Sequence, residues 1–110
     1  MDYYAYIFVR QDLSPEQQLI QFGHVACVMG SMLPKHISPH NLHFVGIGVP
    51  NSRHLLKAKY LMQDSGIYCH EFNETDLEID QLTAVASCPV KGDERNVFKS
   101  YNTLRFAAFT

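Results

Sequence analysis

The chain has 110 residues, of which 46% are apolar, so it is long enough for one domain with its own hydrophobic core and too short for two. Nine Lys and Arg residues face eleven Asp and Glu residues, and the resulting net charge of −2 excludes a surface that neutralises phosphates indiscriminately. The three cysteines, Cys27, Cys69 and Cys88, lack the spacing of metal or redox motifs. We therefore expect buried free thiols in a reducing compartment.

The chain opens with a predicted strand and a predicted helix. Residues 3–9 (YYAYIFV) form an unbroken apolar run, typical of a central strand that is covered on both faces. This run is too short to cross a membrane and has no cleavage site, so we expect a cytoplasmic protein without a membrane partner. Ser14 as N-cap, Pro15 at the first helical position and Gln17 in a capping box predict a helix over residues 15–33.

The middle of the chain predicts a loop, a strand and a second helix. Two prolines make residues 34–40 a loop, and residues 42–49 are a second strand. Asn51 or Ser52 caps the next helix, which stops at Gly66. The apolar residues that we expect this helix to bury are Leu55, Leu56, Ala58, Leu61 and Met62.

The remaining elements are shorter. Strands are predicted over residues 67–72 and 82–88, a helix capped by Asp93 runs through Lys99, and residues 104–109 form an edge strand. Alternating strands and helices favour right-handed crossovers between parallel strands. The sequence therefore predicts a single α/β domain over residues 1–110, with a mixed, mostly parallel four-stranded sheet, a central first strand and helices on both faces.

A series of short matches to one protein family runs through most of the chain. The matching positions are residues 9–13, Gln21, His24, Ala26, Val49, Pro50, Leu55, Leu56, Gly66, Ile67, Glu71, Thr75, Thr83 and Pro89. In order and spacing they resemble the type II peptidyl-tRNA hydrolases over residues 6–89. The family's Gly-Lys-Gly-Lys run has no counterpart, because residues 14–18 (SPEQQ) contain no lysine. The chain is more similar to short, uncharacterised bacterial or phage proteins that share the Asp-Leu-Ser-Pro-x-Gln-Gln opening.

The resemblance implies a fold, an activity and a set of site residues. The implied fold is that of type II peptidyl-tRNA hydrolases, and the implied activity is hydrolysis of the ester bond of peptidyl-tRNA or a related acyl-tRNA, without metal or cofactor and with reduced turnover. The implied catalytic residues are His24, Glu71, Thr75 and Thr83, with Glu71 in place of the family's aspartate. The implied substrate-binding residues are Arg10, Asp12 and Gln21.

These residue types suit the chemistry of ester hydrolysis. A carboxylate such as Glu71 can orient or deprotonate a water molecule, and the hydroxyls of Thr75 and Thr83 can donate hydrogen bonds to an oxyanion. Gln21 and His24 share one stripe of the first helix, beside the end of the first strand. We therefore expect Gln21, His24, Glu71, Thr75 and Thr83 to line one cleft at the carboxyl ends of the strands.

Other readings of the same residues stay open. The domain is alternatively a catalytically silent binding module, or an interaction subunit, such as one half of a homodimer, in which Tyr3, Tyr4 and Tyr6 cover an interface. Pro39 separates the histidines of the loop, so we expect no metal site there. The basic residues of the second half could supply an edge that faces phosphates, but on a near-neutral protein we predict that they are ordinary solvated charges. They are Arg53, Lys57, Lys59, Lys91, Arg95 and Lys99.

Overall fold

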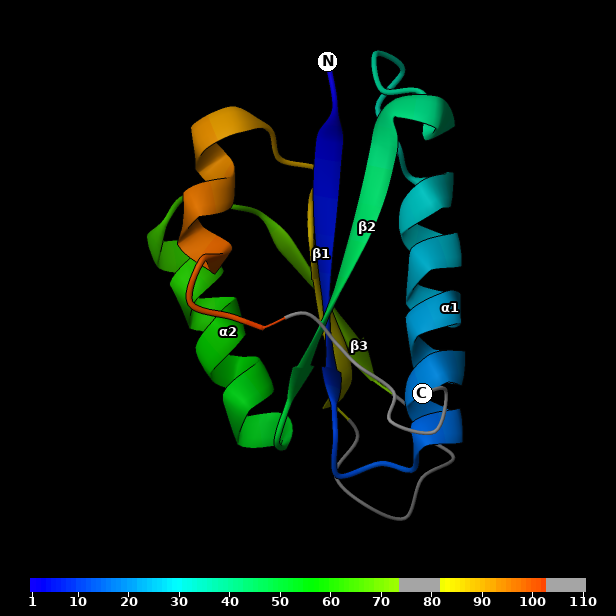
Figure 1. Ribbon diagram of the computed structural model, residues 1–110, viewed down its shortest axis with the longest axis vertical. Helices are drawn as coiled ribbons and strands as arrows, with labels where there is room; N and C mark the ends of the chain where they lie inside the picture. The colour runs from blue at the N-terminus through cyan, green and yellow to red at the C-terminus, as the bar shows by residue number, and fades with distance from the viewer. Residues whose placement is uncertain (74–81, 103–110) are drawn as a thin grey trace.

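The computed structural model describes residues 1–73 and 82–102, and it shows a small α/β domain built around a four-stranded mixed sheet (Figure 1). The strands are β1 (Tyr3–Arg10), β2 (Leu42–Val49), β3 (Cys69–Asn73) and β4 (Leu82–Ser87). Their order across the sheet is β2-β1-β4-β3, so β1 is an interior strand, as its unbroken apolar run predicts.

The direction of the strands differs from the sequence prediction. β1 and β2 pair in parallel, but β1 with β4 and β3 with β4 pair antiparallel. The predicted mostly parallel sheet is therefore wrong, since two of the three pairings are antiparallel. Eight residues separate β3 from β4, and a parallel crossover needs a dozen or more. The rule of alternating strands and helices thus holds for β1 and β2 only.

Helices cover both faces of the sheet, as predicted. On one face, Ile7 and Val9 of β1 pack beneath α1 (Pro15–Ser31). On the other face, Tyr6 and Phe8 pack beneath α2 (Ser52–Asp64) and the 3-10 helix η2 (Gly92–Phe98). In Figure 1 the sheet is seen nearly edge-on, with α1 on one side and α2 and η2 (orange) on the other. Alternating side chains of one strand thereby serve two separate cores.

Capping residues and a glycine determine where the two long helices begin and end. At the start of α1, the Gln17 amide donates to Ser14 Oγ at 3.2 Å, and the Ser14 amide donates to Gln17 Oε1 at 3.3 Å. This is the predicted capping box, and the helix ends at Ser31, two residues earlier than predicted. Asn51 caps α2 by accepting from the His54 amide. Gly66 follows α2 with a φ of 75°, a value that favours glycine.

Several finer expectations are corrected. On α2, Leu56 is 37% exposed, because its position on the helix turns it away from the sheet. Lys91 rather than Asp93 precedes η2, which is a 3-10 helix. A short 3-10 helix, η1 (Pro39–Asn41), overlaps the end of the predicted loop.

The cysteines are free, but they are less buried than expected. Cys27 is exposed, and Cys69 and Cys88 are half-buried, where burial raises the pKa of both thiols. The predicted edge strand of residues 104–109 lies outside the described residues. Within the described part of the chain, no helix is long and apolar enough to span a bilayer.

Candidate functional site

Two of the predicted substrate-binding residues form an ion pair at the end of β1. The guanidinium of Arg10 donates from Nε to Asp12 Oδ1 at 2.9 Å and from Nη2 to Asp12 Oδ2 at 2.7 Å. Its Nη1 donates to the Leu82 carbonyl at 3.2 Å, which ties β1 to the start of β4. Arg10 is 5% exposed, and its hydrogen bonds to Asp12 lower the pKa of that carboxyl. Both groups are therefore engaged within the protein.

The same end of the sheet brings Gln21 and Thr83 together. Thr83 Oγ1 lies 3.2 Å from Gln21 Oε1 and 3.1 Å from the Phe72 carbonyl, and it donates its single proton to one of them at a time. Thr83 is the extra residue of a β-bulge, because Phe72 pairs with Ala84 and Asn73 pairs with Leu82. The bulge directs the fully buried Thr83 side chain toward α1.

Glu71 lies on the opposite face of the sheet. Its Oε1 is 2.7 Å from Nζ of Lys59 on α2, and this hydrogen bond raises the pKa of Lys59. The next residue, Phe72, packs into the α1-side core. Because successive side chains of a strand point to opposite faces, Glu71 must face α2. The prediction that Glu71 shares a cleft with Gln21 and Thr83 is therefore wrong.

Of the two remaining predicted catalytic residues, the structure describes only His24. His24 is exposed on α1, three residues after Gln21, and so lies on the surface rather than against the sheet. Thr75 lies outside the described residues. The structure thus joins Gln21 to Thr83 and Arg10 to Asp12, and it separates Glu71 from them.

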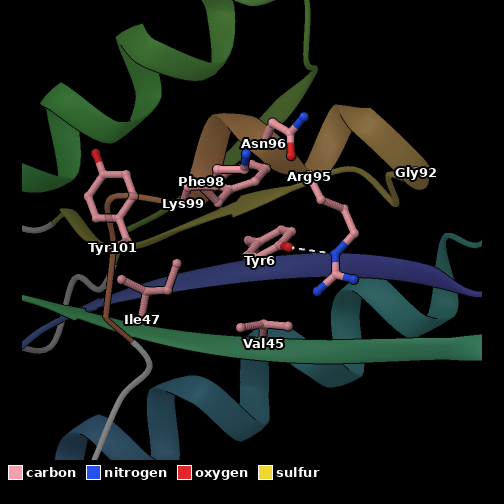
Figure 2. A pocket seen from close by; sticks show the side chains of 9 residues that line it. All are labelled: Tyr6, Val45, Ile47, Gly92, Arg95, Asn96, Phe98, Lys99 and Tyr101. Atoms are coloured by element: carbon pink, nitrogen blue, oxygen red, sulfur yellow. Dashed lines mark hydrogen bonds between the residues drawn. The ribbon is translucent and has the colours of Figure 1, made fainter.

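A second site, absent from the sequence predictions, is a groove of about 370 Å³ between β2 and η2 (Figure 2). Its walls include Tyr6, Val45, Ile47, Arg95, Lys99 and Tyr101. Tyr6 is 5% exposed and stacks on Phe98 with 3.8 Å between ring centroids, so its ring is not available for an intermolecular interface.

Arg95 lines this groove, and two contacts hold its guanidinium in position. Its Nε donates to the Tyr6 hydroxyl at 2.9 Å, as Figure 2 shows, and its Cζ lies 3.5 Å from the centroid of the Tyr4 ring. The hydrogen bond to Tyr6 raises the pKa of Arg95. Sequence reasoning missed this site because Tyr6 and Arg95 are 89 residues apart, and an arginine on a short helix carries no signal of its own.

Comparisons with known proteins inform the fold alone. No family model matches the chain, and no curated protein matches it. Among solved structures, it is similar to Atu0240 from Agrobacterium tumefaciens strain C58, a protein of unknown function. The TM-score is 0.60 at 10% sequence identity, over 96% of this chain and 99% of that one. The fold is therefore shared with a protein whose function is itself open, and the resemblance to type II peptidyl-tRNA hydrolases stays a prediction.

Proposed function

We propose that this protein is a binding module for peptidyl-tRNA or a related acyl-tRNA, which it holds at the surface beside Gln21 and His24, at the end of the sheet, without hydrolysing it. The ligand class comes from the family resemblance of the sequence. The absence of turnover comes from the position of Glu71, which is ion-paired to Lys59 on the face opposite Thr83. A base and an oxyanion donor that lie on opposite faces of a sheet cannot act on one ester.

Asp12 does not replace Glu71 as a base. It offers a carboxylate at the correct end of the sheet, but the two hydrogen bonds from Arg10 hold its pKa below the usual value. A general base is effective when its pKa is near the working pH, so a carboxyl with a lowered pKa is a weak one. The described residues at this end thus favour recognition over catalysis.

Hydrolysis is the second candidate, and the contact between Gln21 and Thr83 favours it. A hydroxyl beside an amide can hold a water molecule or donate to an oxyanion. The reaction would add water to the ester and release the N-blocked amino acid and the free 3′-hydroxyl of the tRNA. Under this alternative, Glu71→Gln leaves the release rate unchanged, because the carboxylate does not reach the ester.

One set of assays separates the two candidates. Binding of N-acetyl-aminoacyl-tRNA is measured by fluorescence, and release of the labelled amino acid is followed from mildly acidic to mildly basic pH. We expect saturable binding, with release no faster than in buffer. His24→Ala should weaken binding, since His24 is exposed next to Gln21, whereas the matched control His40→Ala, in η1, should not.

The outcomes differ for each candidate. Release above buffer that is lost in Thr83→Val, with the fold intact by circular dichroism, would establish the hydrolase and reject the silent module. Binding of uncharged tRNA with the same affinity would remove the acyl group from the proposal. If the acyl-tRNA neither binds nor is hydrolysed, both candidates are wrong.

A further inference from the structure

The groove between β2 and η2 combines an apolar floor with cationic walls. Val45 and Ile47 of β2 form its floor, and Tyr101 flanks it (Figure 2). Arg95 and Lys99 line it from the other side, and no carboxylate is among those of its lining residues that the structure describes. Its volume of about 370 Å³ is within the usual range of small-molecule sites, which is about 300–1,000 Å³.

The guanidinium of Arg95 is already oriented before any ligand arrives. The Tyr4 ring supports one face of the guanidinium, and the Tyr6 hydroxyl accepts its Nε–H. These two contacts use neither terminal nitrogen, and no ion pair of Arg95 with a carboxylate occurs in the described part of the chain. A guanidinium held in this way loses little conformational freedom when it binds an anion in a bidentate manner.

The charges of the groove match a phosphate better than a carboxylate. Arg95 and Lys99 supply two positive charges, and a phosphate monoester carries about −1.5 to −2 at neutral pH. The acidic residues of η2, Asp93 and Glu94, are not lining residues, and Glu94 instead accepts a hydrogen bond from the Lys91 amide at 3.0 Å. Val45 and Tyr101 are half-buried and together offer a surface for a flat ring.

We propose that this groove binds a nucleoside monophosphate, with the phosphate on Arg95 and Lys99 and the base against Val45 and Tyr101. The Asn96 side chain, at the same wall, is an additional hydrogen-bonding group for the ligand. The same chemistry occurs in a free mononucleotide and at the phosphorylated end of an RNA strand. The site is separate from the Gln21 and Thr83 contact and does not rest on the proposed acyl-tRNA binding.

The experiment is a titration of the full chain, labelled with ¹⁵N and ¹³C, monitored by NMR. The probes are AMP, adenosine, inorganic phosphate and a short RNA that ends in a phosphate. We expect AMP to shift the signals of the Val45 and Ile47 methyl groups and of the Arg95 Nε–H. Adenosine and inorganic phosphate should each bind at least about tenfold more weakly, because each lacks one half of the interaction.

Variants test the assignment of the phosphate site. Arg95→Gln should weaken AMP binding by roughly ten- to a hundredfold, whereas Arg53→Gln, an exposed arginine on α2 outside the groove, should leave it unchanged. Arg95→Gln also removes the contact with Tyr6, so a second variant, Lys99→Gln, is needed. Lys99 is exposed, and its replacement should not disturb the fold.

Three results would overturn the proposal. The first is equal affinity for AMP and adenosine. The second is an equal loss of AMP affinity in Arg95→Gln and Arg53→Gln. The third is that AMP shifts signals outside the groove only, while Lys99→Gln binds AMP as tightly as wild type. The RNA arm identifies the source of the ligand. Tighter binding of the RNA than of AMP supports a strand end, and equal or weaker binding supports a free mononucleotide.

Discussion

The buried guanidinium of Arg10 shows how one side chain can organise an end of the sheet. Removing a charge from water is costly unless hydrogen bonds and an opposite charge compensate for it. Arg10 obtains both, from the two Asp12 oxygens and the Leu82 carbonyl. A residue that the family resemblance places in substrate binding thus has a structural role, in joining β1 to β4.

We predict that Asp12→Asn destabilises the fold by about 1–3 kcal/mol, because it leaves a buried guanidinium without its counter-ion. The 38% exposure of the Asp12 side chain keeps the cost near the lower end of that range. Urea denaturation measures the change, and Asp64→Asn, an exposed carboxylate at the end of α2, is the control. Equal stability of the two variants would show that the ion pair contributes nothing.

The same ion pair predicts a dependence on pH. The pKa of Asp12 is lower in the folded protein than its ordinary value of 3.8, so the stabilisation is complete above that value. It is lost as pH falls below about 4, through the lowered folded pKa. The stability difference between wild type and Asp12→Asn should therefore shrink in denaturation curves recorded from neutral pH down to about pH 3. A difference that stays constant over this range would contradict the assignment.

At the scale of elements, the end of α2 depends on one glycine. Gly66 has a φ of 75°, and beyond it the Ile67 amide donates back to the Met62 carbonyl at 2.8 Å. This backbone geometry ends the helix and directs the chain into β3. Gly23, in the middle of α1, provides a comparison, since its φ is not positive.

We predict that alanine has opposite effects at these two glycines. Apart from the adjacent backbone, a Cβ at either position meets no atom within 4 Å, so the backbone conformation decides the result. Gly66→Ala should destabilise the protein by about 1–2 kcal/mol, because its left-handed conformation is strained for L-residues. Gly23→Ala should stabilise it by up to about 1 kcal/mol, because alanine favours the helix. Thermal unfolding measures both, and two shifts of the same sign would refute the argument.

At the scale of the whole molecule, two inner strands hold the fold together. β1 and β4 each pair with a neighbour on both sides, and every described residue of β4 is buried. β2 and β3 are edge strands, and β3 contains only half-buried and exposed residues. Opening β1 or β4 therefore requires the loss of both cores.

We predict that amide hydrogen exchange is slowest in β1 and β4, at residues such as Ile7 and Val85, and faster in β3. Exchange at the inner amides requires global unfolding, whereas an edge strand can open locally. Native-state exchange monitored by NMR provides the measurement. Protection of the Glu71 amide as strong as that of the Val85 amide would show that β3 opens only with the whole domain.

Short-range features of this chain could be read without coordinates. The cap at Ser14, the stop at Gly66 and the interior position of the apolar first strand each depend on a few neighbouring residues, and each occurs as predicted. Glu71 could also have been assigned to its face, since Phe72 must point to the other. These inferences work because backbone dihedrals and the alternation of side chains are set locally.

Contacts between distant residues required the tertiary structure. The reversed direction of β4 depends on how it pairs with β1, more than 70 residues earlier in the chain. The bulge that turns Thr83 toward Gln21 arises from the register between β3 and β4. The Arg95 groove exists because packing of η2 on β1 places Arg95 over Tyr4 and Tyr6. The direction of strand pairing, the register between strands and the meeting of distant side chains are properties of long-range packing, and no single stretch of sequence encodes them.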